Sequence, residues 1–149
     1  MAETSVTKQP LRAQVRDYMS LEPQTLNANQ TLLDAVLLLR SAGLRHIPIL
    51  EEGRLVGVLT DRDVARVAPT FLLPLPAQEY NRLFETTPVG KVMTRNPISI
   101  TPDAPLEEAV ELLYNNRLGC LPVLENEQLV GILTRADILR AVHDLISNP

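Results

Sequence analysis

Two stretches of the chain change from an unbroken apolar run to a helical pattern of apolar and polar residues. They are VGVLTDRDVAR, at 56–66, and VGILTRADILR, at 130–140. Each starts with aliphatic and β-branched residues, as a strand buried on both faces does, and its periodicity changes at a Thr-x-x-Asp step. We therefore predict a strand that passes directly into a helix at Thr60 and again at Thr134.

The two stretches belong to a longer internal repeat. A constant spacing of 74 residues relates Thr60 to Thr134 and aligns 15–68 with 89–142 without a gap, and many apolar positions coincide. Two copies of this length favour one paired unit over an open array of repeats. Because each half is small, we expect the copies to share a core across a pseudo-twofold interface.

The periodicity within each copy predicts the order β-α-β-β-α, which is a mixed α/β class. Apolar residues at i, i+3, i+4 and i+7 predict helices near 31–42 and 105–116, for which Asn29 and Asp103 are candidate caps. A strand, a turn and a second strand are expected in RHIPILEEGRLVGVLT and again in CLPVLENEQLVGILT. The other predicted elements are helices over 61–67 and 135–146, a helical turn over 15–19 and a short strand over 24–27.

The insert between the copies, APTFLLPLPAQEYNRLFETTP, has no counterpart after the second copy. Its prolines exclude a long regular element, although 77–85 can form two helical turns with Tyr80, Leu83 and Phe84 on one side. The apolar run at 71–73 must be covered either by the insert's own domain or by a partner, and both interpretations remain open. We divide the chain into an N-terminal arm (1–14), a first copy (15–68), the insert (69–88) and a second copy (89–149).

Composition narrows the function classes. With 149 residues, 45% hydrophobic and 21% charged, the chain has the composition of a soluble globular domain. The net charge of −4 argues against broad electrostatic binding to nucleic acid or membrane. The start, MAETSVTKQP, has no apolar leader segment and LLDAVLLL is too short to cross a membrane, so we expect a cytoplasmic location. The single cysteine, Cys120, is predicted to be a small core residue.

An enzyme is disfavoured by the motifs that the sequence lacks. It contains no nucleophile elbow, phosphate-binding glycine loop or paired acid and base. No spacing of His, Cys and carboxylate residues matches a zinc or calcium site. We therefore expect no catalytic residue and no metal.

The paired G-h-h-T-x-x-D signatures, where h is apolar, follow the strands HIPIL and CLPVL and the openings YMSLEP and VMTRNP. With these motifs, residues 15–142 resemble a tandem CBS-domain pair, the Bateman module named after cystathionine β-synthase. The insert and LGCLPVLENEQLVGILTRADIL look most like the CBS half of acetoin-utilisation B-type proteins. Those proteins usually continue into an ACT domain, and the present sequence ends at Pro149 without one.

The resemblance implies two βαββα repeats packed with pseudo-twofold symmetry and a homodimer of such pairs. It also implies a regulatory module that binds an adenosine-containing ligand, such as AMP, ADP, ATP or S-adenosylmethionine, in up to two clefts between the repeats. No other cofactor is required. An unidentified regulated protein is a candidate partner, and neither nucleic acid nor membrane is expected.

The resemblance assigns the ligand to the two Thr-x-x-Asp steps. A carboxylate one turn past a strand end can accept hydrogen bonds from both ribose hydroxyls, each worth about 1.5 to 3 kcal/mol. Asp63 and Asp137 are the expected acceptors. Thr60 and Thr134 would add hydroxyls, and the free amides of the helix start favour an anion. The family places adenine near the first strand of each copy, so the further candidates are Thr25, Asn27, Ser99 and Thr101, with Ile47, Val58, Leu121 and Ile132 as apolar walls.

Some of these assignments have a structural alternative. A Thr-x-x-Asp step between a strand and a helix is also a good capping arrangement. The first helix starts with Asp61 and Arg62, and the second starts with Arg135. Both arginines are candidate ligand contacts. Phosphorylated ligands should therefore prefer the second site, unless Arg135 is only a solvated helix residue.

Arg45 and His46 precede the second strand of the first copy. In similar modules this neighbourhood can reach a phosphate, but a histidine at a strand start also occurs for structural reasons alone. The favoured function is ligand sensing by differential affinity, in which the ligand stabilises one arrangement that a partner or the dimer recognises. The alternative is an architectural dimerisation module with non-functional clefts.

Overall fold

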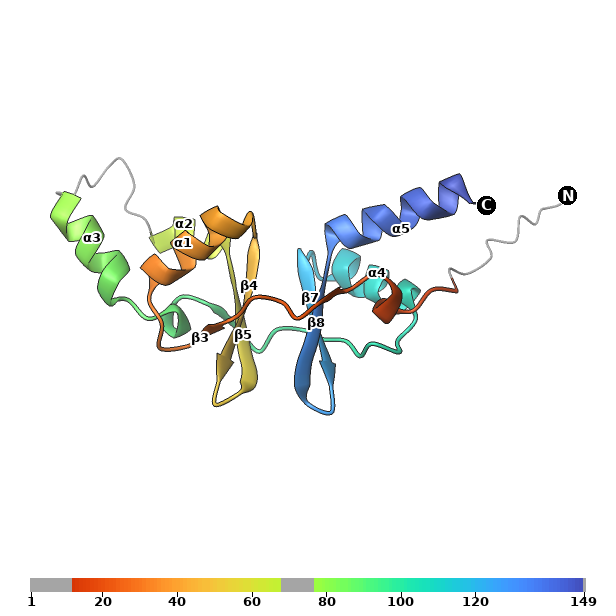
Figure 1. Cartoon of the computed structure of the whole chain (residues 1–149), viewed down its shortest axis with the longest axis horizontal. Helices are drawn as coiled ribbons and strands as arrows, with labels where there is room; N and C mark the ends of the chain where they lie inside the picture. Colours follow the sequence, from red (N-terminus) through yellow and green to blue (C-terminus); the bar gives the residue numbers. More distant parts are fainter. Residues whose placement is uncertain (1–11, 68–76, 149) are drawn as a thin grey trace, which may run out of the picture. The chain divides into compact units, whose positions relative to one another are not determined.

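The computed structural model describes residues 12–67 and 77–148. This part of the chain is a mixed α/β structure, and its first copy has the predicted order of elements (Figure 1). The elements of the first copy are the 3-10 helix η1 (Val15–Asp17), β2 (Ser20–Leu21), β3 (Leu26–Asn27), α1 (Leu32–Ala42), β4 (His46–Glu51), β5 (Arg54–Thr60) and α2 (Asp61–Val67).

The second copy repeats this order after one helix from the insert. A single parallel bridge between Ile100 and Val123 takes the place of the short strand β3. The predicted helix and strand positions are confirmed. The elements are α3 (Ala77–Thr86) from the insert, then the 3-10 helix η2 (Val89–Lys91), β6 (Thr94–Arg95), α4 (Leu106–Asn115), β7 (Cys120–Glu125), β8 (Gln128–Thr134) and α5 (Arg135–Ser147).

The contacts divide the chain into two compact units that differ from the two sequence copies. The first, which we call the α5 unit, comprises the described parts of Met1–Leu21, Ser99–Asn126 and Val130–Pro149. The second, the α1 unit, comprises the described parts of Glu22–Ile98 together with Glu127–Leu129. Each unit therefore contains the helices of one copy and the opening segment of the other, which is residues 15–21 in the α5 unit and residues 89–95 in the α1 unit.

The opening of the first copy is a strand of the α5 unit. There β2 pairs antiparallel with β8, and Ser20 lies opposite Ile132 in a sheet of order β2-β8-β7. In the α1 unit β6, from the opening of the second copy, pairs antiparallel with β5, and Thr94 lies opposite Val58. That sheet has the order β3-β4-β5-β6. The Thr-x-x-Asp steps, which end β5 and β8, thus each lie beside an opening segment from the other copy.

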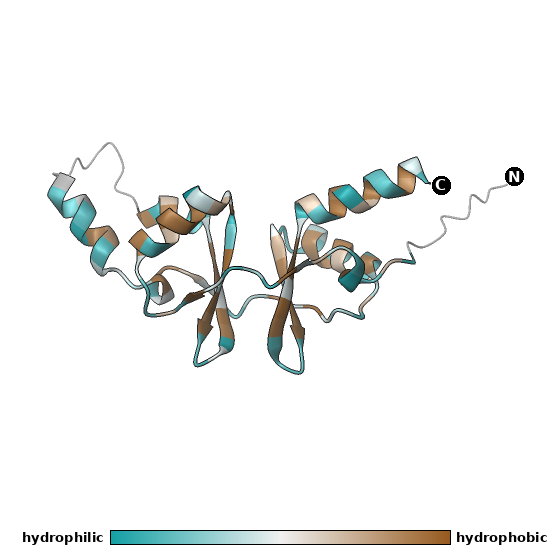
Figure 2. Ribbon diagram, viewed as in Figure 1, coloured by the Kyte–Doolittle hydropathy of each residue, from teal (hydrophilic) through white to brown (hydrophobic). Residues whose placement is uncertain are grey.

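Each unit has a buried apolar cluster of its own, whereas the sequence suggested a shared core. The exchanged openings supply part of it, because Val15 is fully buried in the α5 unit and Val89 is fully buried in the α1 unit. Figure 2 shows the strands as hydrophobic along most of their length and the hairpin turns as hydrophilic. Each large buried aliphatic side chain contributes about 1.5 to 3 kcal/mol. The fully buried ones include Leu32, Ile47, Ile49 and Leu59 in the α1 unit and Leu106, Leu121, Val123 and Leu133 in the α5 unit.

The prediction that Asn29 and Asp103 cap the first long helices is wrong. Thr31 is the N-cap of α1 and accepts the Asp34 N–H on its hydroxyl at 3.3 Å. The N-cap of α4 is Pro105, which makes no side-chain capping bond. The first amide of each helix instead donates to a carbonyl that lies just before the opening of the other copy: Leu32 to Thr87 at 3.0 Å, and Leu106 to Ala13 at 2.9 Å.

The helix predicted within the insert is confirmed as α3, which packs against α1. Phe84 is half-buried against the cluster of the α1 unit. A cavity of about 440 Å³ lies between α1, α2 and α3, with Leu33, Val64 and Phe84 among its lining residues. For its described part, the insert covers its own unit. The apolar run at 71–73 lies outside the described residues.

Candidate ligand-binding site

Asp63 and Asp137 are the buried charged side chains in the described part of the chain, at 5% and 9% exposed. Each lies in the first turn of the helix that follows a strand. The Thr60 N–H donates to Asp63 Oδ2 at 2.9 Å, and the Asp63 N–H donates to Thr60 Oγ1 at 3.1 Å. Thr134 and Asp137 make the same reciprocal pair at 2.8 and 3.4 Å. Both steps are therefore helix caps.

The second oxygen of each carboxylate has other neighbours. Asp63 Oδ1 accepts from Thr94 Oγ1 at 3.5 Å and lies 3.6 Å from Arg66 Nη1. Asp137 Oδ1 lies 3.4 Å from Arg140 Nη2. These contacts are long, and a carboxylate can accept about four hydrogen bonds. One oxygen thus closes the cap, and the other keeps capacity for a further donor.

Arg66 and Arg140 are the basic neighbours of the two carboxylates and were not among the residues predicted from the sequence. The repeat contained the information, because both motifs end with an arginine three residues after the aspartate. Residues at i and i+3 lie on the same side of a helix. Tyr18, whose carbonyl accepts from Arg140 at 2.7 Å, was also missed, and the repeat held no indication of it.

The two helix starts differ in charge. At the start of α5, Arg135 is exposed, and its Nε donates to the Leu118 carbonyl at 3.0 Å. At the start of α2, the Asp61 carboxylate accepts the Arg62 N–H at 3.0 Å, and the Arg62 side chain is exposed. The α5 step thus has a guanidinium tied beside it, whereas the α2 step has a carboxylate. A guanidinium at a helix start favours an anionic ligand.

The start of β4 lies beside the start of α2. His46 is opposite Thr60 in the ladder between β4 and β5. The Arg45 carbonyl accepts the Asp61 N–H at 3.2 Å, while the Arg45 side chain is exposed. The structure therefore brings Arg45 and His46 to the same sheet end as Asp63.

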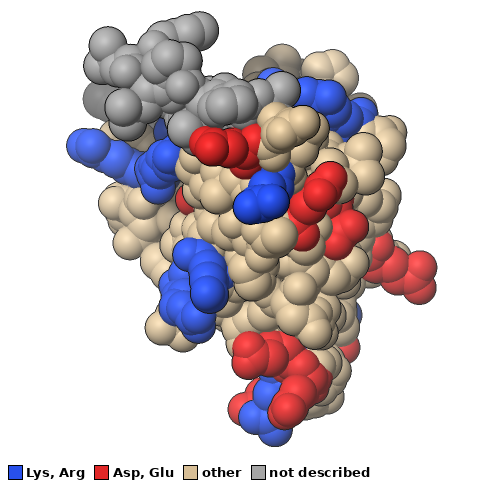
Figure 3. Space-filling model, turned by 90° about the vertical axis from the view of Figure 1, so that its left-hand side faces the viewer, with Lys and Arg blue, Asp and Glu red and all other residues tan. Residues whose placement is uncertain are grey.

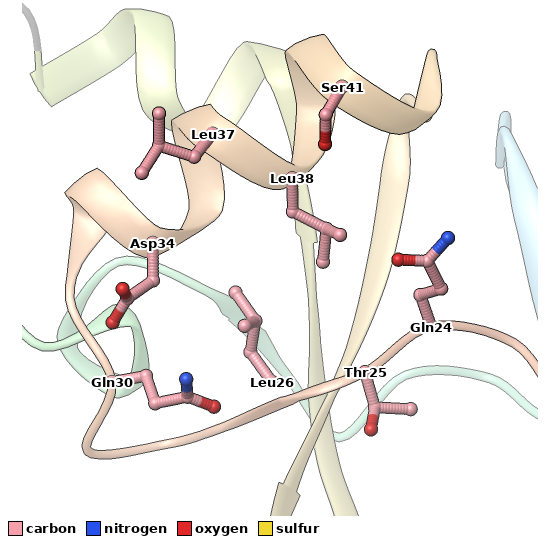
Figure 4. A pocket seen from close by; sticks show the side chains of 8 residues that line it. All are labelled: Gln24, Thr25, Leu26, Gln30, Asp34, Leu37, Leu38 and Ser41. Atoms are coloured by element: carbon pink, nitrogen blue, oxygen red, sulfur yellow. The ribbon is translucent and has the colours of Figure 1, made fainter.

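Thr25 lines a cavity of about 470 Å³ between α1 and the segment that leads into it. Figure 4 shows Leu26 and Leu38 extending into the space between that segment and the helix. Apolar surfaces with a few polar groups are usual in small-molecule sites. Asn27, in contrast, is exposed and accepts the Asn29 N–H at 3.2 Å on its side chain. The other lining residues of the cavity are Gln24, Gln30, Asp34, Leu37 and Ser41.

Ser99 and Thr101 flank Ile100, and Ile100 lies against β7. The Ile100 N–H donates to the Pro122 carbonyl at 3.1 Å. Ser99 is half-buried, and Thr101 is exposed and donates its hydroxyl to Asp103 at 2.8 Å. These two positions therefore lie at the edge of the α5 unit.

The four predicted apolar walls divide into two pairs. Ile47 and Leu121 are fully buried within the two clusters, so their side chains belong to the cores. Val58 and Ile132 each precede a core leucine of their strand. Because successive side chains of a strand point to opposite faces, these two lie on the other face of their sheets.

The surface charges are mixed. On the face drawn in Figure 3, basic and acidic side chains of the described residues alternate without a continuous basic area. Within residues 12–67 and 77–148, no three His, Cys, Asp or Glu side chains are grouped so that they could hold a metal ion. None of the helices in these ranges is both long and apolar enough to cross a membrane.

The sequence matches the CBS domain twice, over residues 15–69 and 89–144. These matches cover most of the chain. The protein therefore belongs to the CBS-domain family. The resemblance to a tandem CBS pair is confirmed, and so is the mixed α/β fold with two CBS repeats.

Three solved structures illustrate the similarity. A putative acetoin utilization protein (AcuB) from Vibrio cholerae is 32% identical, with a TM-score of 0.75 over 91% of this chain and 93% of the other. CBSX2 in complex with AMP is 27% identical, with a TM-score of 0.74 over 89% and 98%. The CBS domain pair of MJ0100, in complex with 5-methylthioadenosine and S-adenosyl-L-methionine, is 27% identical, with a TM-score of 0.73 over 89% and 98%. CBS pairs similar to this chain thus bind adenosine compounds.

Proposed function

We propose that this protein is a regulatory, non-catalytic CBS pair that binds an adenosine-containing ligand at its Thr-x-x-Asp steps. The observation that carries the proposal is that the two oxygens of each buried carboxylate have different partners. Oδ2 of Asp63 and of Asp137 closes a helix cap, whereas the contacts of Oδ1 with other described residues are 3.4 Å or longer. The two hydroxyls of a ribose are suitable donors for such an oxygen. The AMP and S-adenosyl-L-methionine complexes of similar CBS pairs support this ligand class.

The regulatory mechanism we propose is differential affinity. A ligand shifts an equilibrium between arrangements only by the difference between its affinities for them. A second copy of the chain, or an unidentified partner protein, would recognise the favoured arrangement. Exposed apolar residues along α5 support association with a second copy, since Leu139 and Ile146 are 70% and 73% exposed.

We further propose that phosphorylated ligands, such as AMP, ADP or ATP, prefer the Asp137 step. Arg135 lies at the start of α5, and its tie to Leu118 reduces the entropy lost when it binds a phosphate. The Asp61 carboxylate at the start of α2 repels an anion.

Isothermal titration calorimetry with AMP, ATP and S-adenosylmethionine tests the proposal. Asp137→Ala should weaken AMP binding by about 10- to 100-fold, since each charge-assisted bond is worth about 1.5 to 3 kcal/mol. Asp63→Ala is the matched control and should retain AMP binding. If only Asp63→Ala lost it, the proposed ranking of the two steps would be wrong.

The architectural alternative has one observation in its favour, because both Thr-x-x-Asp steps are complete caps without a ligand. It predicts no heat of binding with any of the three compounds and a dimer in sedimentation equilibrium. That combination of results would replace the sensor proposal.

A further inference from the structure

Arg140, on α5, contacts both Asp137 of the same helix and Tyr18 of the opening segment. Its Nη2 donates to the Tyr18 carbonyl at 2.7 Å and lies 3.4 Å from Asp137 Oδ1. Its guanidinium carbon is 5.2 Å from the centre of the Tyr18 ring, which is within the range of a cation–π contact. The Tyr18 hydroxyl in turn donates to Asp144 Oδ2 at 2.8 Å. One side chain thus touches both a candidate ligand carboxylate and the exchanged opening segment.

The α1 unit has no matching arrangement in its described part. The position that corresponds to Tyr18 is Val92, which packs on the apolar cluster. Arg66 corresponds to Arg140, and among the described residues it forms an ion pair with Asp63 at 3.6 Å. The Arg66 side chain is 76% exposed, compared with 55% for Arg140. The two sequence copies therefore share the arginine but not its second contact.

The position of Arg140 depends on both of its neighbours. The Asp137 carboxylate attracts the guanidinium from one side, while the Tyr18 carbonyl and ring hold it from the other. Oδ1 can accept more than one donor, but a ribose hydroxyl at normal hydrogen-bond distance is closer than Arg140, and it would weaken the 3.4 Å contact of the guanidinium with this oxygen. The guanidinium then loses one of the contacts that keep it on Tyr18, and the opening segment loses part of its attachment to α5.

We propose that Arg140 is a positioning residue that couples the Asp137 carboxylate to the docking of the opening segment, Val15–Leu21, on α5. Ligand binding at Asp137 would then loosen this segment, whereas Arg66 has no such role in the α1 unit. The ligand-dependent part of this inference rests on the proposed function. The coupling itself is a property of the ligand-free chain.

Hydrogen exchange of the amides of residues 18–21 measures the docking directly. Asp137→Asn keeps an acceptor oxygen for the cap but places an amide group beside Arg140. It should raise the exchange rates by about two- to fivefold, which corresponds to the worth of an exposed cation–π contact. Arg140→Gln should raise them by a similar factor. The double variant should exchange no faster than Arg140→Gln alone.

The double variant separates coupling from simple damage to the cap. If Asp137→Asn accelerated exchange equally with and without Arg140, the effect would not pass through the arginine and the proposal would be overturned. Arg66→Gln is the matched control, and it should leave the amides of residues 92–95 unchanged. If Arg66→Gln accelerated exchange at residues 92–95 as much as Arg140→Gln does at residues 18–21, the effect would be general for this arginine. That result would also contradict the proposal.

AMP serves as the probe for the ligand-dependent part. At saturation it should accelerate exchange at residues 18–21 in the native chain and not in Arg140→Gln. If AMP bound without this difference, the coupling proposal would fail while the proposed function stood. If AMP and the other adenosine compounds did not bind, the proposed function would fail. The exchange rates of the single and double variants without ligand would still test the coupling.

Discussion

Gly131 and Ser20 are in direct backbone contact, so that a Cβ atom added to Gly131 would lie 2.8 Å from the Ser20 carbonyl oxygen. The same relationship exists in the other unit, where a Cβ on Gly57 would lie 2.7 Å from the Thr94 carbonyl oxygen. Each central strand therefore has a glycine at the point where the opening segment of the other copy pairs with it. The exchange of openings depends on this absence of a side chain.

Gly131→Ala should destabilise the protein by about 1 to 3 kcal/mol, the usual cost of forcing extra atoms into a packed region. The nearest atoms include backbone, which cannot yield as a flexible side chain can. Urea denaturation measures the change, with Gln128→Ala, at an exposed position of the same strand, as the control. A free energy of unfolding within about 0.5 kcal/mol of the native value would contradict the prediction.

Thr134→Ala should cost about 0.5 to 2 kcal/mol of stability, because it removes the hydroxyl that accepts the Asp137 N–H. Thr134→Ser keeps this acceptor and should lose much less. Thermal unfolding compares the two variants. Thr101→Ala is a suitable control, since the Thr101 hydroxyl bonds to Asp103 and caps no helix. Equal effects of Ala and Ser at position 134 would argue against the cap.

Burial raises the pKa of the Cys120 thiol from 9.0 to about 12. Between these two pH values the thiol is neutral in the folded chain and ionised in the unfolded chain. Its contribution to stability is therefore complete below pH 9.0 and is lost as the pH rises toward about 12. A thiol reagent should react slowly with the native protein and quickly in denaturant. Rapid reaction of the native protein would show that Cys120 is accessible.

The pKa of the Tyr18 phenol is raised, chiefly by its hydrogen bond to Asp144, with smaller contributions from desolvation and the Asp144 charge. Because the raised value favours the neutral phenol in the folded chain, this contribution to stability is present below the ordinary pKa of tyrosine and is lost above it. Asp144→Asn should lower the Tyr18 pKa. Phenolate absorbance against pH measures it, in a chain where Tyr80 and Tyr114 are replaced by Phe. An unchanged titration would mean that the hydroxyl does not bond to Asp144.

Arg135→Gln should weaken AMP binding several-fold and leave adenosine binding unchanged, because its charge acts on the phosphate alone. Exposed ion pairs are worth about 0.2 to 1 kcal/mol, so the expected loss is about two- to fivefold. Calorimetry with both compounds measures the difference. Arg62→Gln, at the start of α2, is the control and should change neither affinity. An equal loss for AMP and adenosine would indicate that Arg135 only supports the helix start.

The repeated Thr-x-x-Asp step, the strand before it and the helix after it could all be predicted from the sequence, because they rest on local signals. Apolar periodicity, a threonine at the helix N-cap and an acid three residues later act within a single turn. The same local signals selected Asn29 and Asp103 as caps, and there they failed. Carbonyls of distant segments satisfy those helix starts, since Leu106 donates to Ala13 and Leu32 donates to Thr87.

The sequence by itself determined the duplication, the order of elements and the positions of the two acids at the strand-to-helix steps. Tertiary structure alone decided which neighbours those acids have. The Tyr18 carbonyl and Arg140 are separated by 122 residues, and the exchange of opening segments brings them together. Such contacts depend on the packing of distant segments, which no periodicity within one copy encodes.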